Sequence, residues 1–314
     1  MRKTCVDMVY TLAQKDERVV FIGSDLSPGL LRDMKAAMPD RHYMEGVTEQ
    51  NVIGMAAGMA MDGYTPFVNT IATFITRRCY EQVALDLCLH DLPVRLIANG
   101  GGVVYAPLGP THLAVEDMAI MRALPNMTVT AVVDADEMVR LMEASVNWPH
   151  PIYIRLGKGG DPIVSRAENC FAIGKGIVMR ERSGRDPVLL ISCGVMTNRA
   201  LKAADMLAEK SIASEVIHIH TVKPLDDKLI LERARGARCV FTIEEHTVIG
   251  GLGSAVVDLL VEQPVAPPPM RKLGLPDHFQ HNYGSQDDLL EIAGLQPHQI
   301  AAHIEQELFK LRVA

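Results

Sequence analysis

The sequence predicts an α/β protein with two domains, each built on a mostly parallel sheet covered by helices. Short apolar runs alternate with longer helical patterns, the alternation stops at 157–186 where glycines and prolines gather, and it then resumes. The length of 314 residues also suits two domains of ordinary size. We therefore expect a first domain at 1–160, a linker at 161–186 and a second domain at 187–314.

The expected elements follow from the spacing of apolar residues. The first buried strand is expected at Val19–Ile22, where four apolar residues in a row end at Gly23. A short strand is expected near Ile177–Met179 inside the linker, and prolines interrupt the second domain at 264–269. In the first domain we expect further strands at 65–70, 94–98, 128–133 and 151–154, and helices at 49–62, 74–90, 113–123 and 135–147. In the second domain we expect strands at 188–193, 214–219 and 239–243, and helices at 197–210, 226–235, 253–262 and 297–311.

Composition argues against several classes of protein. The formal net charge is −7 and the longest basic block is the pair Arg77-Arg78, which argues against nucleic acid as the main partner. The longest apolar stretch, Val52–Met61, spans ten residues and is too short to cross a bilayer. Six scattered cysteines without a CxxC pair are typical of reduced thiols. Because charged residues also interrupt the N-terminal segment, we expect a cytoplasmic protein without a signal peptide.

Two candidate site residues lie at expected helix starts. Ligands of open parallel sheets bind where the carboxyl ends of the strands and the following loops converge. Glu49 lies in the first turn of such a helix, where the helix dipole favours a carboxylate, although the pattern alone favours an ordinary capping acid after Thr48. Phe74 follows a strand, so its ring suits stacking on a flat heterocycle, but a lone Phe is more often part of the core.

Two further loops combine polar residues with glycines. The loop Asn99–Gly102 with Gly109–His112 is neither a GxGxxG dinucleotide loop nor a Walker loop. His112 suits a proton donor or an oxyanion partner, and a structural loop histidine is the equal alternative. Glu244 and Glu245 follow a strand, and because no further ligands occur at suitable spacing, a solvated charged loop is favoured over a metal site.

Taken in order, these segments resemble the transketolase family of thiamine-diphosphate enzymes over nearly the whole chain. The motifs that carry the resemblance are Arg2-Lys3, Gly23-Ser24-Asp25-Leu26-Ser27-Pro28, Gly46-Val47-Thr48-Glu49-Gln50, Thr73-Phe74, Gly109-Pro110-Thr111-His112, Ile154-Arg155, Ile243-Glu244-Glu245-His246 with Gly250-Gly251-Leu252-Gly253, and Leu273-Gly274-Leu275-Pro276-Asp277. Each motif is weak by itself, but their common order outweighs the structural alternatives for Glu49, Phe74 and His112. The resemblance implies a pyrimidine-binding fold followed by a transketolase C-terminal-like domain.

The resemblance also implies roles for the site residues. Glu49 would be catalytic by forming a hydrogen bond with N1′ of the aminopyrimidine of thiamine diphosphate, and Phe74 would stack on that ring. His112 would be catalytic and contact the oxygens of the substrate. No metal ligand is implied in this chain. The remaining implied ligands are Arg77 and Asp25 for the cofactor, and Arg155 and Arg2 for the substrate.

The motif that this family uses for the diphosphate is absent from the sequence. The family holds the diphosphate through Mg²⁺ with a Gly-Asp-Gly motif and a later Asn, and no Gly-Asp-Gly occurs here. The resemblance therefore implies that this chain binds the pyrimidine end and that an N-terminal partner subunit binds Mg²⁺. Because the chain starts at Met1 near that domain boundary, we expect a natural split gene, with a homodimer of this chain as the core of a heterotetramer.

The leading functional hypothesis is the transfer of a two-carbon ketol unit between sugar or sugar-phosphate substrates. Three departures bear on the substrate. Leu108 stands where transketolases have Asp, Asn99–Gly102 lacks the family's His or Arg, and Arg77 matches deoxyxylulose-phosphate synthase. The alternatives are a synthase-like or 2-oxo-acid dehydrogenase β-like subunit acting on pyruvate, and a scaffold that has lost activity. The combined presence of the three central site residues argues against the scaffold.

Overall fold

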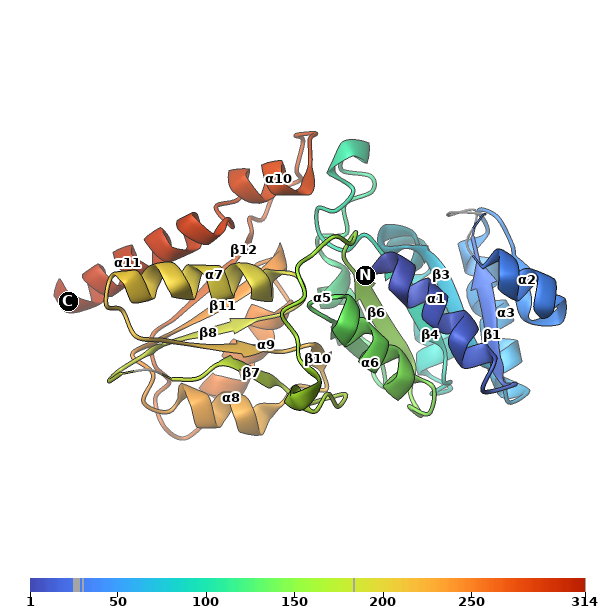
Figure 1. Ribbon diagram of the computed structural model, residues 1–314, viewed down its shortest axis with the longest axis horizontal. Coiled ribbons are helices and arrows are strands. Elements are labelled where there is room, and N and C mark those ends of the chain that lie inside the picture. Colours follow the sequence, from blue (N-terminus) through green and yellow to red (C-terminus); the bar gives the residue numbers. More distant parts are fainter. Residues whose placement is uncertain (25–28, 30, 183, 314) are drawn as a thin grey trace.

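The computed structural model describes residues 1–24, 29, 31–182 and 184–313. The chain forms two sheets with flanking helices, one in each half of the molecule, which lie side by side (Figure 1). The predicted fold class, two mostly parallel and helix-covered sheets, is confirmed. Within the described part of the chain, no helix is long and apolar enough to span a membrane.

The first sheet consists of β1 (Val19–Gly23), β2 (His42–Met44), β3 (Thr65–Ile71), β4 (Arg95–Asn99), β5 (Thr128–Ala131), β6 (Ile152–Leu156) and β10 (Thr221–Lys223). Its order is β10-β5-β6-β4-β3-β1-β2. The first six strands pair in parallel, whereas β10 pairs with β5 in the antiparallel direction. The strands β1, β4, β5 and β6 are buried along their whole length, which explains the continuous apolar runs that predict them.

The helices of the first half are α1 (Arg2–Ala13), α2 (Arg32–Ala37), α3 (Glu49–Met61), α4 (Tyr80–Gln82), α5 (Asp117–Ala123) and α6 (Ala135–Ser145), with the short helices η1 (Pro39–Arg41), η2 (Phe74–Arg78), η3 (Val83–Cys88) and η4 (Ala106–Leu108). Helices α1 and α6 pack against each other, while α3 packs on β3 (Figure 1). The expected helix at 74–90 is divided, because η2 and η3 have the wider π-helical turn. Such π-turns are frequent at functional sites.

The second sheet consists of β7 (Ile177–Arg180), β8 (Val188–Ser192), β9 (Ser214–His218), β11 (Cys239–Thr247) and β12 (Met270–Leu275), in the order β12-β11-β8-β9-β7. Only β7, at the edge, is antiparallel to its neighbour among these strands. The predicted short strand in the linker is confirmed as β7. The accompanying helices are η5 (Ala167–Asn169), α7 (Met196–Glu209), α8 (Asp227–Ala234), α9 (Leu252–Val261), α10 (Gln286–Ile292) and α11 (Pro297–Val313).

Some elements differ from the expectations for physical reasons. The strand β10 has only three residues, one of them a buried valine, so it is too short to give a strand pattern. The strand β12 is an edge strand with Arg271 and Lys272 exposed, which hides its apolar alternation. Helix α5 begins only at Asp117, because the residues before it form the loop after His112. The domain limits at 160 and 187 stay predictions.

The parallel strands of the first sheet end in register at one edge. Gly23 of β1 lies opposite Asn69 of β3, and Asn99 of β4 lies between Ile71 and Leu156. Because these carboxyl ends coincide, the loops that follow β2, β3, β4 and β6 meet at the same edge of the sheet. This edge is the place where the sequence predicts the site.

Candidate active site

Glu49 is a buried carboxylate at the start of α3. The residue is 4% exposed although it opens a helix at the surface of the sheet. Thr48 precedes it at the N-cap position, but its side chain accepts no hydrogen bond from the helix, and its hydroxyl donates to the Glu45 carbonyl at 2.7 Å. The Glu49 carboxylate instead accepts a hydrogen bond from Arg78 Nη1 at 2.7 Å. A buried carboxylate with one charged partner is a strong acceptor, because the low local dielectric strengthens its hydrogen bonds.

Phe74 opens the π-helix η2 just beyond β3, and its ring meets two other side chains. The His112 ring lies edge-on to it, with centroids 5.3 Å apart and an interplanar angle of 63°. The Arg78 guanidinium carbon lies 4.4 Å from the centroid of the Phe74 ring. Glu49, Phe74 and His112, which lie far apart in the sequence, are therefore brought together, with Arg78 joining the first two.

Arg78 is a site residue that the sequence reasoning missed. In the sequence, the pair Arg77-Arg78 is considered only as the longest basic block, which does not indicate which residue Arg78 contacts. One signal was available, because Phe74 and Arg78 are four residues apart in an expected helix, and such residues face each other. Its partner Glu49 lies 29 residues earlier and is reached only through the fold.

Arg77 points away from this group toward the segment after His112. Its Nε forms an ion pair with Glu116, Nη2 donates to the same carboxylate at 2.7 Å, and Nη2 also donates to the Leu113 carbonyl at 2.9 Å. The partner carboxylate raises the pKa of Arg77, which stays charged. Arg77 thus holds the segment that follows His112, and its implied contact with the cofactor stays a prediction.

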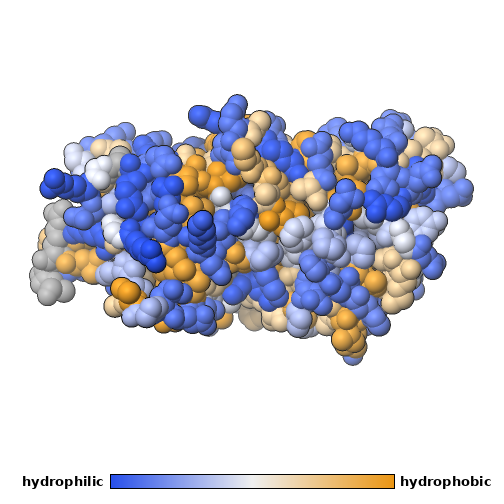
Figure 2. Space-filling view, turned by 90° about the horizontal axis from the view of Figure 1, so that it is seen from below, coloured by the Kyte–Doolittle hydropathy of each residue, from blue (hydrophilic) through white to orange (hydrophobic). Residues whose placement is uncertain are grey.

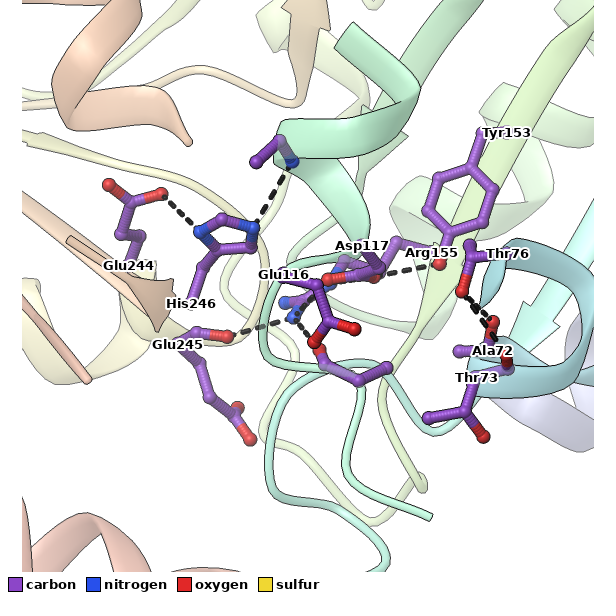
Figure 3. Close-up of polar contacts among 12 residues, drawn as sticks. Ala72, Thr73, Thr76, Glu116, Asp117, Tyr153, Arg155, Glu244, Glu245 and His246 are labelled. Carbon is purple, nitrogen blue, oxygen red and sulfur yellow. Dashed lines mark hydrogen bonds and ion pairs between the residues drawn. The ribbon is translucent and has the colours of Figure 1, made fainter. Parts of the chain in front are cut away.

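Arg155 lies in a buried network below the site edge (Figure 3). Its Nε and Nη2 donate to the Asp117 carboxylate at 2.7 and 3.1 Å, and Nη2 also donates to the Glu245 carbonyl at 2.8 Å. Tyr153 donates its hydroxyl to Asp117 at 2.7 Å. Burial alone would raise the pKa of Asp117, but the charge and hydrogen bonds of Arg155 outweigh it and lower that pKa. Since these donors are already engaged with protein groups, the implied substrate contact of Arg155 stays a prediction.

The expectation of a solvated charged loop at Glu244–His246 is wrong. All three residues belong to β11 and are at most 2% exposed. Glu244 accepts hydrogen bonds from the backbone N–H groups of Leu252 and Gly253, at 2.7 and 2.8 Å, at the start of α9. His246 accepts from the Ala119 N–H of α5 at 3.2 Å (Figure 3). The acids are buried because the fold supplies a donor for their oxygens, which the sequence pattern does not reveal.

Glu245 connects the second half to the glycine-rich loop after β4. Its carboxylate accepts from the Val103 N–H and from the Gln286 amide, both at 2.8 Å. Burial raises the pKa of both Glu244 and Glu245, partly offset by nearby cations and donors. A Cβ at Gly102 would lie 2.5 Å from the Glu245 carboxylate, and its φ of +69° also favours glycine. The glycine loop is thus shaped by a close approach of the second half.

Two further residues, Asp25 and Arg2, are implied as ligands by the family resemblance. Asp25 lies outside the described residues. Arg2, at the start of α1, carries a charge that acts on Tyr105, whose pKa is raised by burial and lowered in part by Arg2. The Tyr105 ring fills the space beside Gly100, where a Cβ would meet it at 2.1 Å. The substrate contact that the resemblance implies for Arg2 stays a prediction.

The site edge fits the aminopyrimidine end of thiamine diphosphate by the chemistry of its groups. The ring needs an aromatic face and a buried carboxylate, which Phe74 and Glu49 provide. The hydroxyl of Thr73, next to Phe74, is buried without a hydrogen-bond partner, so it offers a further polar contact. Among the described residues, no group of three or more His, Cys, Asp or Glu side chains is arranged to hold a metal ion.

Comparison with known proteins defines the class. Residues 1–160 match the family model described as transketolase, pyrimidine binding domain, and residues 175–300 match that described as transketolase, C-terminal domain. The two parallel sheets are therefore those of a thiamine-diphosphate-dependent class of transferases. The chain belongs to the transketolase family.

Similar proteins include both short and long members of the family. An uncharacterized transketolase family protein of Sinorhizobium fredii is 40% identical over 95% of this chain and 86% of its own length. A 6-deoxy-6-sulfo-D-fructose transketolase subunit of a Clostridium species is 37% identical over 96% of this chain and 93% of its own. A 1-deoxy-D-xylulose-5-phosphate synthase of Geobacter sulfurreducens is 36% identical over 95% of this chain but only 46% of its own.

Similar solved structures also include one chain of about this length and one longer chain. A split gene transketolase, described as an inactive beta4 tetramer, superposes with a TM-score of 0.88 at 36% identity and 97% coverage of both chains. A transketolase of Pichia stipitis superposes with a TM-score of 0.79 at 18% identity, over 97% of this chain and 45% of its own. The second likeness concerns the fold alone.

Proposed function

We propose that this chain is the C-terminal subunit of a split transketolase-like enzyme. The enzyme would transfer a two-carbon ketol unit between sugar or sugar-phosphate substrates with thiamine diphosphate. The observation that carries the proposal is the convergence of Glu49, Phe74 and His112 at one edge of the first sheet. The similar Clostridium protein, a transketolase subunit of nearly the same length, supports it.

The residues of the chain would divide the work at this edge. Thiamine diphosphate, when bound, supplies the electron sink for breaking a carbon–carbon bond beside a carbonyl group. The buried Glu49 carboxylate would hold a proton in a hydrogen bond at N1′ of the ring, and Phe74 would fix the ring plane by stacking. His112, whose Nδ1 lies 2.9 Å from the Thr111 hydroxyl, would contact a substrate oxygen and move a proton there. Arg77 would keep His112 in place by holding the segment that follows it.

An N-terminal partner would complete the site. Because the sequence lacks the Gly-Asp-Gly motif, the partner would bind Mg²⁺ and the diphosphate. Large apolar side chains are exposed at the ends of α3 and η4 (Met61 and Leu108), in η3 and directly after it (Leu85 and Leu89), and in the loop before α3 (Val47). Exposed apolar groups of this kind suit contacts with other subunits. We place a homodimer of this chain at the core of a heterotetramer, in the cytoplasm.

A synthase-like reaction with pyruvate is the second candidate. It is favoured by the 36% identity to 1-deoxy-D-xylulose-5-phosphate synthase. Arg77, which the resemblance assigns to the synthase pattern, is paired with Glu116 in the segment that follows His112. The chain spans about half the length of that relative, so a partner would be needed in this case too.

Co-expression with the N-terminal partner tests the proposal. The purified pair should show ketol transfer that depends on thiamine diphosphate and Mg²⁺, assayed with several ketose donors and aldose acceptors. Condensation of pyruvate with an aldehyde, in the absence of ketol transfer, would favour the second candidate. A pair that binds the cofactor but converts neither class of donor would overturn both.

A further inference from the structure

Arg78 makes two contacts at once, and both lie at the proposed cofactor site. Its Nη1 donates to the Glu49 carboxylate at 2.7 Å, and its guanidinium carbon lies 4.4 Å above the Phe74 ring. A planar cation over an aromatic face is a favourable pair, and a charge-assisted hydrogen bond to a buried carboxylate is stronger than a neutral one. The two contacts hold the flat guanidinium between these residues.

These two contacts are the ones that an aminopyrimidine ring needs. Such a ring is also flat, would stack on the Phe74 face, and would share a proton with the Glu49 carboxylate. A stacking distance of 4.4 Å leaves no room for a second flat group between the guanidinium and the ring. On the face of Phe74 that Arg78 covers, the Arg78 side chain in this position and a bound pyrimidine ring therefore exclude each other.

We propose that Arg78 is a built-in placeholder for the pyrimidine ring, which the cofactor displaces when it binds. The inference rests on the proposed function, because it concerns the same site. The placeholder keeps the Glu49 carboxylate paired until the cofactor arrives. An unpaired buried carboxylate would otherwise destabilise the chain.

The structure allows this displacement without unfolding the site. The Arg78 side chain is 43% exposed, whereas that of Glu49 is 4% exposed, so the arginine can turn into water while the glutamate stays in place. Arg78 is also the last residue of the π-helix η2, where the backbone is not locked in a regular α-helix. Phe74, which starts the same helix, is half-buried and stays in position.

A placeholder weakens the apparent binding of the cofactor, because the cofactor binds only the fraction of molecules in which Arg78 has turned away from the site. Replacing Arg78 with Ala in the chain assembled with its partner should therefore tighten thiamine diphosphate binding, by about tenfold in Kd. Isothermal titration calorimetry at fixed Mg²⁺ measures this constant independently of turnover. Arg180→Ala is a matched control, because it removes an arginine from an exposed pair with Asp205, 2.7 Å apart, at the end of β7 in the second sheet.

The outcomes separate this inference from the proposed function. If the wild-type pair binds no thiamine diphosphate, the proposed function is wrong. If the wild-type pair binds it and Arg78→Ala binds equally well or more weakly, Arg78 is not a placeholder, and a weaker constant would make it a cofactor ligand. The Arg180→Ala pair should bind as the wild type does.

A second measurement uses the isolated chain. Arg78→Ala should lower its melting temperature, because the Glu49 carboxylate loses its charged partner. Combining Arg78→Ala with Glu49→Gln should recover most of the loss, since a neutral amide costs less to bury than a carboxylate. An unchanged melting temperature in Arg78→Ala, with no coupling to Glu49→Gln, would contradict the placeholder.

Discussion

Glu49 is the residue on which the proposed chemistry depends most. Its carboxylate is buried at the start of α3 and is joined to Phe74 through Arg78. A buried carboxylate that accepts a hydrogen bond from a protonated ring nitrogen takes part in general acid–base catalysis, which typically contributes 10²–10⁴-fold to a rate. We therefore expect Glu49 to matter more for the rate of the reaction than for the stability of α3.

Replacing Glu49 with Gln tests this role. The amide keeps the size of the side chain but not its charge, so we expect turnover of the assembled enzyme to fall by about 10²–10⁴-fold. Steady-state kinetics at saturating thiamine diphosphate measure the effect. Glu81→Gln, at an exposed position of α4, is the control and should retain full turnover. Full turnover in Glu49→Gln, with an unchanged fold, would contradict the role.

At the residue scale, the resemblance predicts Glu49, Phe74 and His112 from their order in the sequence, and the structure brings the three side chains together. Their roles stay predictions. Arg78 was missed because its contact with Glu49 joins two segments through the fold. The burial of Glu244 was missed because adjacent acids usually face water, and only the tertiary structure shows the N–H donors that they meet.

At the scale of elements, the start of α9 depends on an acid from the neighbouring strand. Gly251 precedes the helix and has no side chain to cap it, so the first N–H groups donate to Glu244 of β11. A Cβ at Gly251 would lie 2.1 Å from that carboxylate, which explains the glycine. The acid thus replaces a local capping residue and suits the positive end of the helix dipole.

Replacing Glu244 with Ala should destabilise the chain by about 2 kcal/mol, the upper range for a lost helix cap. Two buried N–H groups of α9 would lose their acceptor. Urea unfolding followed by circular dichroism measures the change. Glu262→Ala, at the exposed C-terminal end of the same helix, should change stability much less. Equal effects of the two substitutions would show that Glu244 does not cap α9.

Elements were predicted well where the local pattern is strong. The strands β1, β4, β6 and β8 are continuous apolar runs and are fully buried, as parallel strands covered on both faces must be. The strand β10 has no such pattern, because its place is set by pairing with β5 across the two halves. The π-helical turns of η2 and η3 could not be predicted from the sequence either, because the spacing of their apolar residues resembles that of an ordinary α-helix.

At the scale of the whole molecule, buried polar contacts join the two halves. Arg155 of β6 donates to the Glu245 carbonyl of β11, and the Glu137 carboxylate of α6 is hydrogen-bonded to Nε2 of His218 in β9 at 2.9 Å. Both partners of the latter pair are fully buried. On the face shown in Figure 2, hydrophobic residues lie in several separate groups between hydrophilic ones. The halves are thus held by specific polar pairs as well as by apolar packing.

Replacing Asp117 with Asn should destabilise the chain by about 3–5 kcal/mol, because it leaves the buried Arg155 guanidinium without its counter-charge. The free energy of unfolding from urea titration measures this loss. Asp205→Asn, which breaks the exposed pair with Arg180, is the matched control and should cost no more than about 1 kcal/mol. A loss as small as that of the control would show that Arg155 does not depend on Asp117.

We propose that this chain provides only the pyrimidine end of a cofactor site shared with a partner. This claim is tested by calorimetric titration of thiamine diphosphate with Mg²⁺ into the isolated chain, the isolated N-terminal partner and their mixture. We predict tight binding by the mixture, at one cofactor for each copy of this chain, and much weaker binding by either subunit alone. Equally tight binding by one isolated subunit, or no binding by the mixture, would contradict the claim.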